Sequence, residues 1–182
     1  MDLPDWVARA RNKWTNTGAA RPAFAVEPGP GQESVWDYPR PPAFVPDARL
    51  VQVTTRDGAP IAETSNALRV LETSQAPAFY LPPDAVVPGS LVTTRGSSLC
   101  EWKGEAEYVA LTGGSGAPIG WRYPRPFPEF ESWAGCVSFY PDRVTCRGDG
   151  ELVRPMAGGF YGGWITDDVV GPFKGEAGTS GW

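Results

Sequence analysis

The chain has 182 residues, a formal net charge of −5 at neutral pH and no histidine. Because proteins hold a phosphate backbone chiefly through clustered lysine and arginine, this acidic composition argues against a nucleic-acid partner, and the lack of histidine excludes Ser-His-Asp and Cys-His nucleophile arrangements. With 20 prolines and 22 glycines, the composition favours turns and short strands, so we expect one mainly β domain.

Residues 1–33 predict a short helix followed by an extended arm. Pro4 precedes a run of good helix formers in which Trp6, Ala10 and Trp14 share one face. An apolar face of this kind is typical of a helix docked on a domain. The arm contains too many prolines and glycines for regular structure.

Residues 34–146 are expected to form the β core. The clearest local prediction is a hairpin, in which strands at 50–55 and 61–64 are joined by a tight turn at Asp57-Gly58. Residues 69–72 fit either a strand or part of a short helical turn, and the sequence leaves both alternatives open.

Further short strands are predicted in the second half of the core. Residues 78–81 form an apolar strand that ends at two prolines. Alternating acidic and apolar residues predict a half-exposed strand at 104–111, which a glycine-rich turn joins to a strand at 119–123. One helical turn at 129–135 precedes two strand pieces that flank a corner at Pro141-Asp142.

Residues 147–182 are rich in glycine but keep several aromatic side chains. Aromatic residues are uncommon in solvated linkers, so we expect this segment to pack on the core. The chain is thus predicted to be a small single domain of antiparallel hairpins, tent-like or barrel-like, with a short N-terminal helix and Gly/Pro-rich arms.

The three cysteines, Cys100, Cys136 and Cys146, are too few for a four-cysteine zinc site and form no Cys-x-x-Cys pair. The first residues do not resemble a charged and apolar signal segment, and no apolar run reaches the roughly eighteen residues that a membrane-spanning helix needs. We therefore expect a soluble cytoplasmic protein with free thiols and no membrane partner, and with neither a metal nor another cofactor.

A Trp-x-Tyr-Pro-Arg-Pro hexamer occurs twice, at 36–41 and 121–126. Trp and Tyr offer flat apolar faces, and Arg40 and Arg125 are candidates for clamping a carboxylate or phosphate. The alternative is a rigid aromatic frame at two corners of a sheet, where proline blocks further strand pairing. A shorter repeat, Lys-Gly-Glu-Ala at 103–106 and 174–177, supports no model of duplication.

Cys100 and Lys103 are the reactive side chains of the central stretch. A nearby cation favours the thiolate, and a buried lysine can itself become a nucleophile. The alternative is a buried thiol beside a lysine that reaches solvent. Arg69 and Glu72 are predicted to form an ion pair, which either orients a ligand and supplies a carboxylate base or is purely structural.

Five short motifs resemble those of the domain-of-unknown-function 427 family, and they occur in the same order as in members of that family. They are Val35-Trp36-Asp37-Tyr38-Pro39-Arg40-Pro41-Pro42, Arg69-Val70-Leu71-Glu72-Thr73-Ser74, Tyr80-Leu81-Pro82-Pro83-Asp84, Cys100-Glu101-Trp102-Lys103-Gly104-Glu105-Ala106 and Phe139-Tyr140-Pro141-Asp142-Arg143. The resemblance implies a small, mainly β domain of the tent-like kind. Where relatives often have proline this chain has Glu101, which changes the polarity around Cys100.

The family also sometimes carries a nucleotidyltransferase label. Such an enzyme needs a close acidic pair to hold the metal that bridges the triphosphate and the attacking group. Glu105 and Glu107 have a suitable spacing, but alternate residues of a strand more often form a solvated face. Asp167-Asp168 is interpreted as a surface pair, so nucleotidyl transfer remains a minor alternative.

The leading hypothesis is an aromatic and cationic pocket that binds a small anionic metabolite, with a metal-independent reaction left open. The opposing hypothesis is a non-catalytic module that binds another protein or forms a homo-oligomer through its terminal arms. The candidate catalytic residues are Cys100, Lys103 and Glu72. The candidate ligand-binding residues are Arg40, Arg69, Tyr80, Gly104, Tyr108, Trp121, Tyr123 and Arg125.

Overall fold

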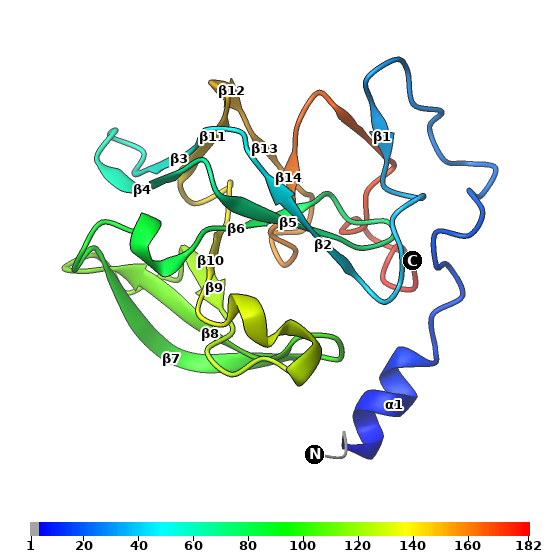
Figure 1. The fold of residues 1–182 in the computed structure, drawn as a ribbon, viewed down its shortest axis with the longest axis horizontal. Helices are drawn as coiled ribbons and strands as arrows, with labels where there is room; N and C mark the ends of the chain where they lie inside the picture. Colours follow the sequence, from blue (N-terminus) through cyan, green and yellow to red (C-terminus); the bar gives the residue numbers. More distant parts are fainter. Residues whose placement is uncertain (1–3) are drawn as a thin grey trace.

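The computed structural model describes residues 4–182 and is mainly β, with 35% of residues in strands and 9% in helices. Several antiparallel sheets and one short N-terminal α-helix make up the fold, which confirms the predicted fold class (Figure 1). The sheets do not close into a barrel within the described residues, so the barrel-like alternative is wrong.

The helical segments are short. The α-helix α1 (Asp5–Arg11) follows Pro4 and ends before Trp14, which therefore lies beyond the helix rather than on its apolar face. Two 3₁₀ helices, Pro83–Ala85 and Pro128–Trp133, form turns between strands. No helix among residues 4–182 is long and apolar enough to cross a membrane.

The predicted hairpin is present as β3 (Val51–Thr54) and β4 (Pro60–Thr64), which pair antiparallel. Gly58 has φ 93° in the connecting turn, a left-handed conformation that glycine adopts without steric cost. β11 (Thr145–Gly148) pairs with the other edge of β3, and β12 (Glu151–Leu152) completes a four-stranded sheet.

A second four-stranded sheet has the order β10–β9–β8–β7. Its strands are β7 (Leu91–Cys100), β8 (Gly104–Leu111), β9 (Gly120–Arg122) and β10 (Val137–Phe139). β7 was not predicted from the sequence, because its Thr, Ser and Gly residues do not alternate with apolar ones. β7 is an edge strand with mostly exposed side chains, and its pairing with β8 shifts register between Thr93 and Ser97.

A three-stranded sheet with the order β2–β5–β6 adjoins the second sheet. Its strands are β2 (Ala43–Asp47), β5 (Ala67–Leu71) and β6 (Ala78–Tyr80). Residues 69–71 belong to β5, so the strand alternative for this stretch is correct. Just beyond β6, Leu81 and Val137 exchange two backbone hydrogen bonds of 2.8 Å, which join this sheet to β10.

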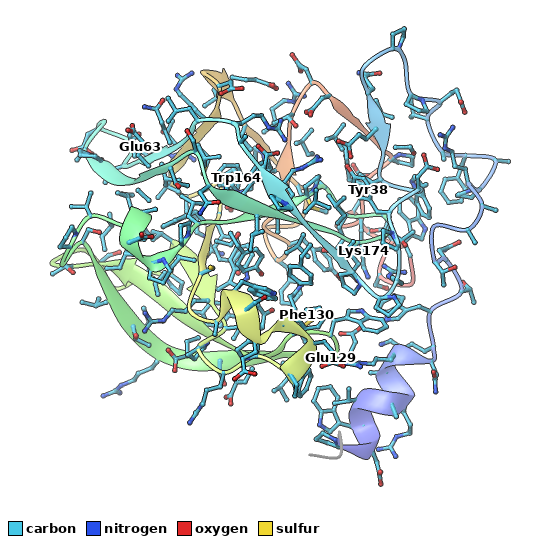
Figure 2. All side chains as sticks on the ribbon, in the orientation of Figure 1. Tyr38, Glu63, Glu129, Phe130, Trp164 and Lys174 are labelled. Atoms are coloured by element: carbon cyan, nitrogen blue, oxygen red, sulfur yellow. The ribbon has the colours of Figure 1, made fainter. Side chains whose placement is uncertain are left out.

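The C-terminal segment returns across the fold, as the orange and red ribbon shows (Figure 1). It supplies β15 (Val169–Val170), parallel to β1 (Glu33–Ser34), and the antiparallel pair β13 (Arg154–Pro155) and β14 (Trp164–Ile165). Trp164 is 1% exposed and stacks on Phe79 with ring centroids 4.9 Å apart, in the interior of the molecule (Figure 2). The segment therefore contributes a large side chain to the core.

Two neighbouring clusters of buried side chains form most of the interior. The first is largely aliphatic and includes Val53 and Ile61 from the hairpin and Val109 from β8. The second is largely aromatic and includes Tyr80 and Trp121. Because Tyr and Trp carry polar atoms at the edges of their rings, this second cluster is able to line a polar cavity.

Candidate functional site

A cavity of about 320 Å³ lies beside the aromatic cluster. Its walls come from β6, from the β7–β8 hairpin and β9, and from residues near both ends of the described chain. Seven of the eleven candidate residues line it, namely Glu72, Tyr80, Cys100, Lys103, Tyr108, Trp121 and Tyr123. The fold therefore brings side chains that are far apart in the sequence together in one cavity wall. Their functional roles stay predictions.

The tight end of the β7–β8 hairpin places Cys100 and Lys103 in the cavity wall. Cys100 pairs with Gly104 across the hairpin, so residues 101–103 form the turn. Lys103 is only 9% exposed, and its Nζ lies 5.9 Å from the centroid of the Tyr123 ring. None of the side-chain hydrogen bonds or salt bridges among residues 4–182 involves this ammonium group.

The surroundings of Lys103 favour its charged form. Burial acts to lower the pKa of Lys103. Attraction to negative charge outweighs burial, so the pKa lies above its usual value; the charges are those of Cys100 and Tyr80 when deprotonated, and of the carboxylates of Glu72 and Glu101. Burial also raises the pKa of the Cys100 thiol, although Lys103 acts against this shift. At neutral pH the pair is an ammonium beside a neutral thiol, and neither group is in its nucleophilic form.

Buried tyrosine hydroxyls supply hydrogen-bonding groups to the same wall. The Tyr80 hydroxyl accepts a hydrogen bond of 2.8 Å from Trp121 Nε1. Burial raises the pKa of Tyr80 to about 12, and that of Tyr140 to about 12 as well. Because both hydroxyls keep their protons at neutral pH, each can donate a hydrogen bond as well as accept one.

Glu72 has a different ion-pair partner from the predicted one. Arg40 Nε lies 3.3 Å from Glu72 Oε1, and the two side chains are 1% and 8% exposed. Arg69 instead contacts Glu33 at 2.9 Å and Asp47 at 3.1 Å, away from the cavity. The predicted Arg69–Glu72 pair is wrong because residues three apart along a strand direction point to opposite faces.

Arg40, Gly104 and Arg125 also lie outside the cavity lining. Arg40 is behind Glu72, where its guanidinium donates to the backbone oxygens of Asn16, Thr73 and Trp182. Gly104 faces the backbone of residues 125–127, so protein rather than ligand approaches it. Arg125 is exposed. The two hexamers therefore differ in role: the first buries its arginine, whereas the second lines the cavity with its Trp and Tyr.

A cluster of cations around the Trp14 ring was not predicted from the sequence. Arg40 Cζ and Lys174 Nζ each lie 4.2 Å from the ring centroid, and Lys13 Nζ lies 4.9 Å from it. Trp14 Nε1 donates a hydrogen bond of 2.8 Å to Glu101 Oε1. Trp14 and both lysines line the cavity, so they form a second charged wall in addition to Lys103.

The C-terminal segment packs closely against an aromatic ring and so forms the remaining part of the cavity wall. A Cβ atom on Gly162 would lie 2.1 Å from Cη2 of Trp121, so only glycine allows the backbone to contact this ring. The neighbouring Tyr161 lines the cavity, and its ring centroid is 5.2 Å from Lys174 Nζ. Residues outside the β core are thus part of the cavity wall.

The titration of Lys174 provides a test of this geometry. Burial, followed by the charge of Arg40, lowers the pKa of Lys174 to about 8. In the unfolded chain the pKa is about 10.4, so between about pH 8 and pH 10 the unfolded state binds more protons and stability increases with pH. We expect the free energy of unfolding of the wild type minus that of Lys174→Met to rise across this window.

Urea denaturation at each pH measures this difference, and the subtraction removes the contributions of the cysteines and tyrosines that both proteins share. Below about pH 7 the lysine is protonated in both states, so the difference is expected to be constant there. A difference that stays constant from pH 7 to pH 10 would contradict the lowered pKa.

The acidic pairs considered for nucleotidyl transfer are engaged at the surface. Glu105 accepts a hydrogen bond of 2.6 Å from the Ser97 hydroxyl, and Glu107 lies 3.4 Å from Arg122. Asp167-Asp168 forms salt bridges with arginines. Within residues 4–182 no three His, Cys, Asp or Glu side chains gather in an arrangement that could hold a metal ion.

Comparison with known proteins places the chain in a family but not in a functional class. No curated protein matches it. The family model described as a domain of unknown function (DUF427) matches residues 43–150, from β2 to just beyond β11. The matched part includes the hairpin with Cys100 and Lys103, whereas Trp14 and Lys174 lie outside it. The match covers more than half of the chain, which therefore belongs to the DUF427 family.

Proposed function

We propose that the cavity binds a small organic anion and that Lys103 contacts its negative group. The observation that carries this proposal is the position of Lys103, which is 9% exposed and lines the cavity, while its ammonium forms no hydrogen bond or ion pair with a residue of the described chain. A buried charge without a partner is costly, so a ligand anion at this position would stabilise the site. A carboxylate or phosphate oxygen would accept a charge-assisted hydrogen bond from Nζ.

The balance of charges in the cavity supports an anionic ligand. Three lysines line it, against the two carboxylates of Glu72 and Glu101. Glu72 is already paired with the guanidinium of Arg40, just behind the wall. The remaining positive charge attracts an anion, and the low dielectric constant of the aromatic wall strengthens that attraction relative to water.

Apolar side chains at the opening suit the other end of such a ligand. Leu99 and Phe160 are 64% and 67% exposed, and no other large hydrophobic side chain among residues 4–182 is as exposed. Both also line the cavity, so they lie at its mouth. A ligand with its anionic end at Lys103 would place an apolar body against them, which favours a ligand site over a general interaction surface.

The protonation states support binding rather than nucleophilic catalysis by the hairpin residues. The raised pKa of Lys103 keeps its amine protonated, as a binding cation requires. The raised pKa of Cys100, which comes first from burial, keeps the thiol neutral and able to contact an apolar group. We therefore assign Lys103 to ligand binding and Cys100 to the cavity wall.

Replacing Lys103 with methionine is expected to weaken ligand binding about 10- to 100-fold. A hydrogen bond to a charged group contributes about 1.5–3 kcal/mol, and each 1.4 kcal/mol is about a tenfold change in Kd. A ligand is first selected by thermal shift from carboxylates and phosphorylated metabolites, because selective binding stabilises the native state. Isothermal titration calorimetry then gives Kd for the wild type and for Lys103→Met.

Arg125→Met is the matched control, since it removes an exposed cation that does not line the cavity. Its Kd is expected to equal that of the wild type. An unchanged Kd in Lys103→Met would contradict the proposed role of Lys103. A wild type that none of the anions stabilises, but that self-associates, would support the interaction-module hypothesis instead.

A further inference from the structure

All lysines of this chain line the same cavity. The sequence contains three, Lys13, Lys103 and Lys174, and each belongs to the cavity wall. The rest of the 16 basic residues are arginines, and all of them lie in the described part of the chain. None of the arginines lines the cavity. Arginine and lysine are not equivalent here, because only lysine can lose its proton and become an amine nucleophile in a protein.

Lys174 has the environment of such an amine. It lies in the C-terminal segment, where Figure 2 labels it, and is 2% exposed. The hydrogen bond that it donates is to the main-chain oxygen of Trp182, at 3.2 Å, and no Asp or Glu side chain of residues 4–182 forms a salt bridge with it. Arg40 donates to the same oxygen at 2.9 Å, so a second cation lies beside the amine.

The groups that face Lys174 act on its charge in both directions. Arg40 and Lys13 disfavour the ammonium, as burial does, whereas Glu72 and Glu101 favour it, and the lowering influences prevail. Desolvation together with a neighbouring cation is a known way to activate a lysine as a nucleophile. Glu72 and Glu101 also act on the pKa of Lys103, so both lysines lie close to the same two carboxylates.

We propose that Lys174 forms an imine with the carbonyl carbon of an oxo acid, a carboxylic acid that also carries an aldehyde or ketone, bound in this cavity. The inference rests on the proposed function, because Lys103 would hold the carboxylate of the same molecule. Lys103 remains a cation for binding, and Lys174 is the amine for bond formation. The two lysines thus have complementary tasks on one ligand.

The chemical step balances without an oxidant or reductant. The Lys174 nitrogen attacks the carbonyl carbon, the C–N bond forms, and the carbonyl oxygen takes up both amine protons and leaves as water. We assign to Glu101 the transfer of a proton between nitrogen and oxygen, because it lines the cavity, acts on the charge of Lys174 and forms no salt bridge among the described residues, although one of its oxygens accepts a hydrogen bond from Trp14. The product is a neutral imine, which water reverses.

Reductive trapping tests the proposal on the full-length wild-type chain. The protein is incubated with sodium cyanoborohydride, which reduces an imine to a stable secondary amine, and with glyoxylate or 4-formylbenzoate as oxo acids. Peptide mass spectrometry then reports labelling separately at Lys13, Lys103 and Lys174. Benzaldehyde, which lacks the carboxylate, is the control compound. Arg95→Lys is the control protein, because it adds a lysine at an exposed position of β7 outside the cavity lining.

We expect at least one oxo acid to label Lys174 about tenfold or more faster at pH 7 than the lysine introduced by Arg95→Lys. The rate at Lys174 is expected to level off above about pH 8, whereas the rate at the introduced lysine continues to rise toward pH 10. Labelling of Lys174 no faster than that of the introduced lysine would overturn the proposal.

The two proposals fail in different ways. If non-reacting carboxylates bind through Lys103 but Lys174 is not labelled, the imine proposal is wrong and the anion site stands. If benzaldehyde labels Lys174 as fast as both oxo acids do, and Lys103→Met does not change the rate, the assignment to oxo acids is wrong. Selective labelling by an oxo acid that Lys103→Met slows would support both proposals together.

Discussion

Replacing Glu72 with alanine is expected to lower the free energy of unfolding by about 3–5 kcal/mol. Glu72 is ion-paired with Arg40 at 3.3 Å, and both side chains are nearly inaccessible to water. Truncating one partner of a buried ion pair leaves the other charge uncompensated, which costs about this much. Urea denaturation with linear extrapolation measures the change.

The matched control removes a glutamate whose ion pair is open to solvent. Glu107 lies 3.4 Å from Arg122, and each of these side chains is 36% exposed. Exposed pairs contribute less than about 1 kcal/mol, so Glu107→Ala is expected to have a small effect. Similar losses in Glu72→Ala and Glu107→Ala would show that burial does not set the strength of the Arg40–Glu72 pair.

Arg40 also explains why the two copies of the Trp-x-Tyr-Pro-Arg-Pro hexamer differ in role. Its guanidinium donates to backbone oxygens before the first copy, after β5 and at Trp182, so one side chain joins three segments. Arg125, the matching residue of the second copy, is exposed. The difference depends on contacts between distant parts of the chain, and a local repeat carries no information about them.

The secondary-structure elements that depend on signals close together in the sequence were predictable. The hairpin of β3 and β4 depends on β-branched strands around an Asp57-Gly58 turn, and both signals lie within fifteen residues. β7 was not predictable, because its residues do not alternate between apolar and polar. Its pairing with β8 is what holds it as a strand, through the short turn at residues 101–103.

The candidate site was predictable where reactive residues cluster in the sequence. Cys100 ends β7 and Lys103 ends the turn that follows it, so their short separation brings them together. The ion-pair partner of Arg69 was predicted wrongly, because that partner depends on which way the Arg69 side chain points from β5. The sequence left open whether this stretch forms a strand at all. Lys174 was missed because its position depends on the return of the C-terminal segment. The available signal was the rarity of lysine, together with the shared Lys-Gly-Glu-Ala at 103–106 and 174–177.

Replacing Trp164 with alanine is expected to lower the free energy of unfolding by about 3–5 kcal/mol as well. The ring is 1% exposed and stacks on Phe79, so truncation leaves a large cavity. It also removes the hydrogen bond of 3.0 Å from the Trp164 indole to the backbone oxygen of Phe139, which would remain buried without that donor. Thermal and urea denaturation measure the loss.

Phe160→Ala is the control from the same segment, because this ring is 67% exposed and is expected to change stability by no more than about 0.5 kcal/mol. A small loss in Trp164→Ala would mean that the segment only covers a core that is stable without it. A large loss in a single cooperative transition would make the segment part of the folding unit, although it extends beyond the family match. Lys174 and Lys103 would then be held by the same cooperative structure, as a ligand that contacts both requires.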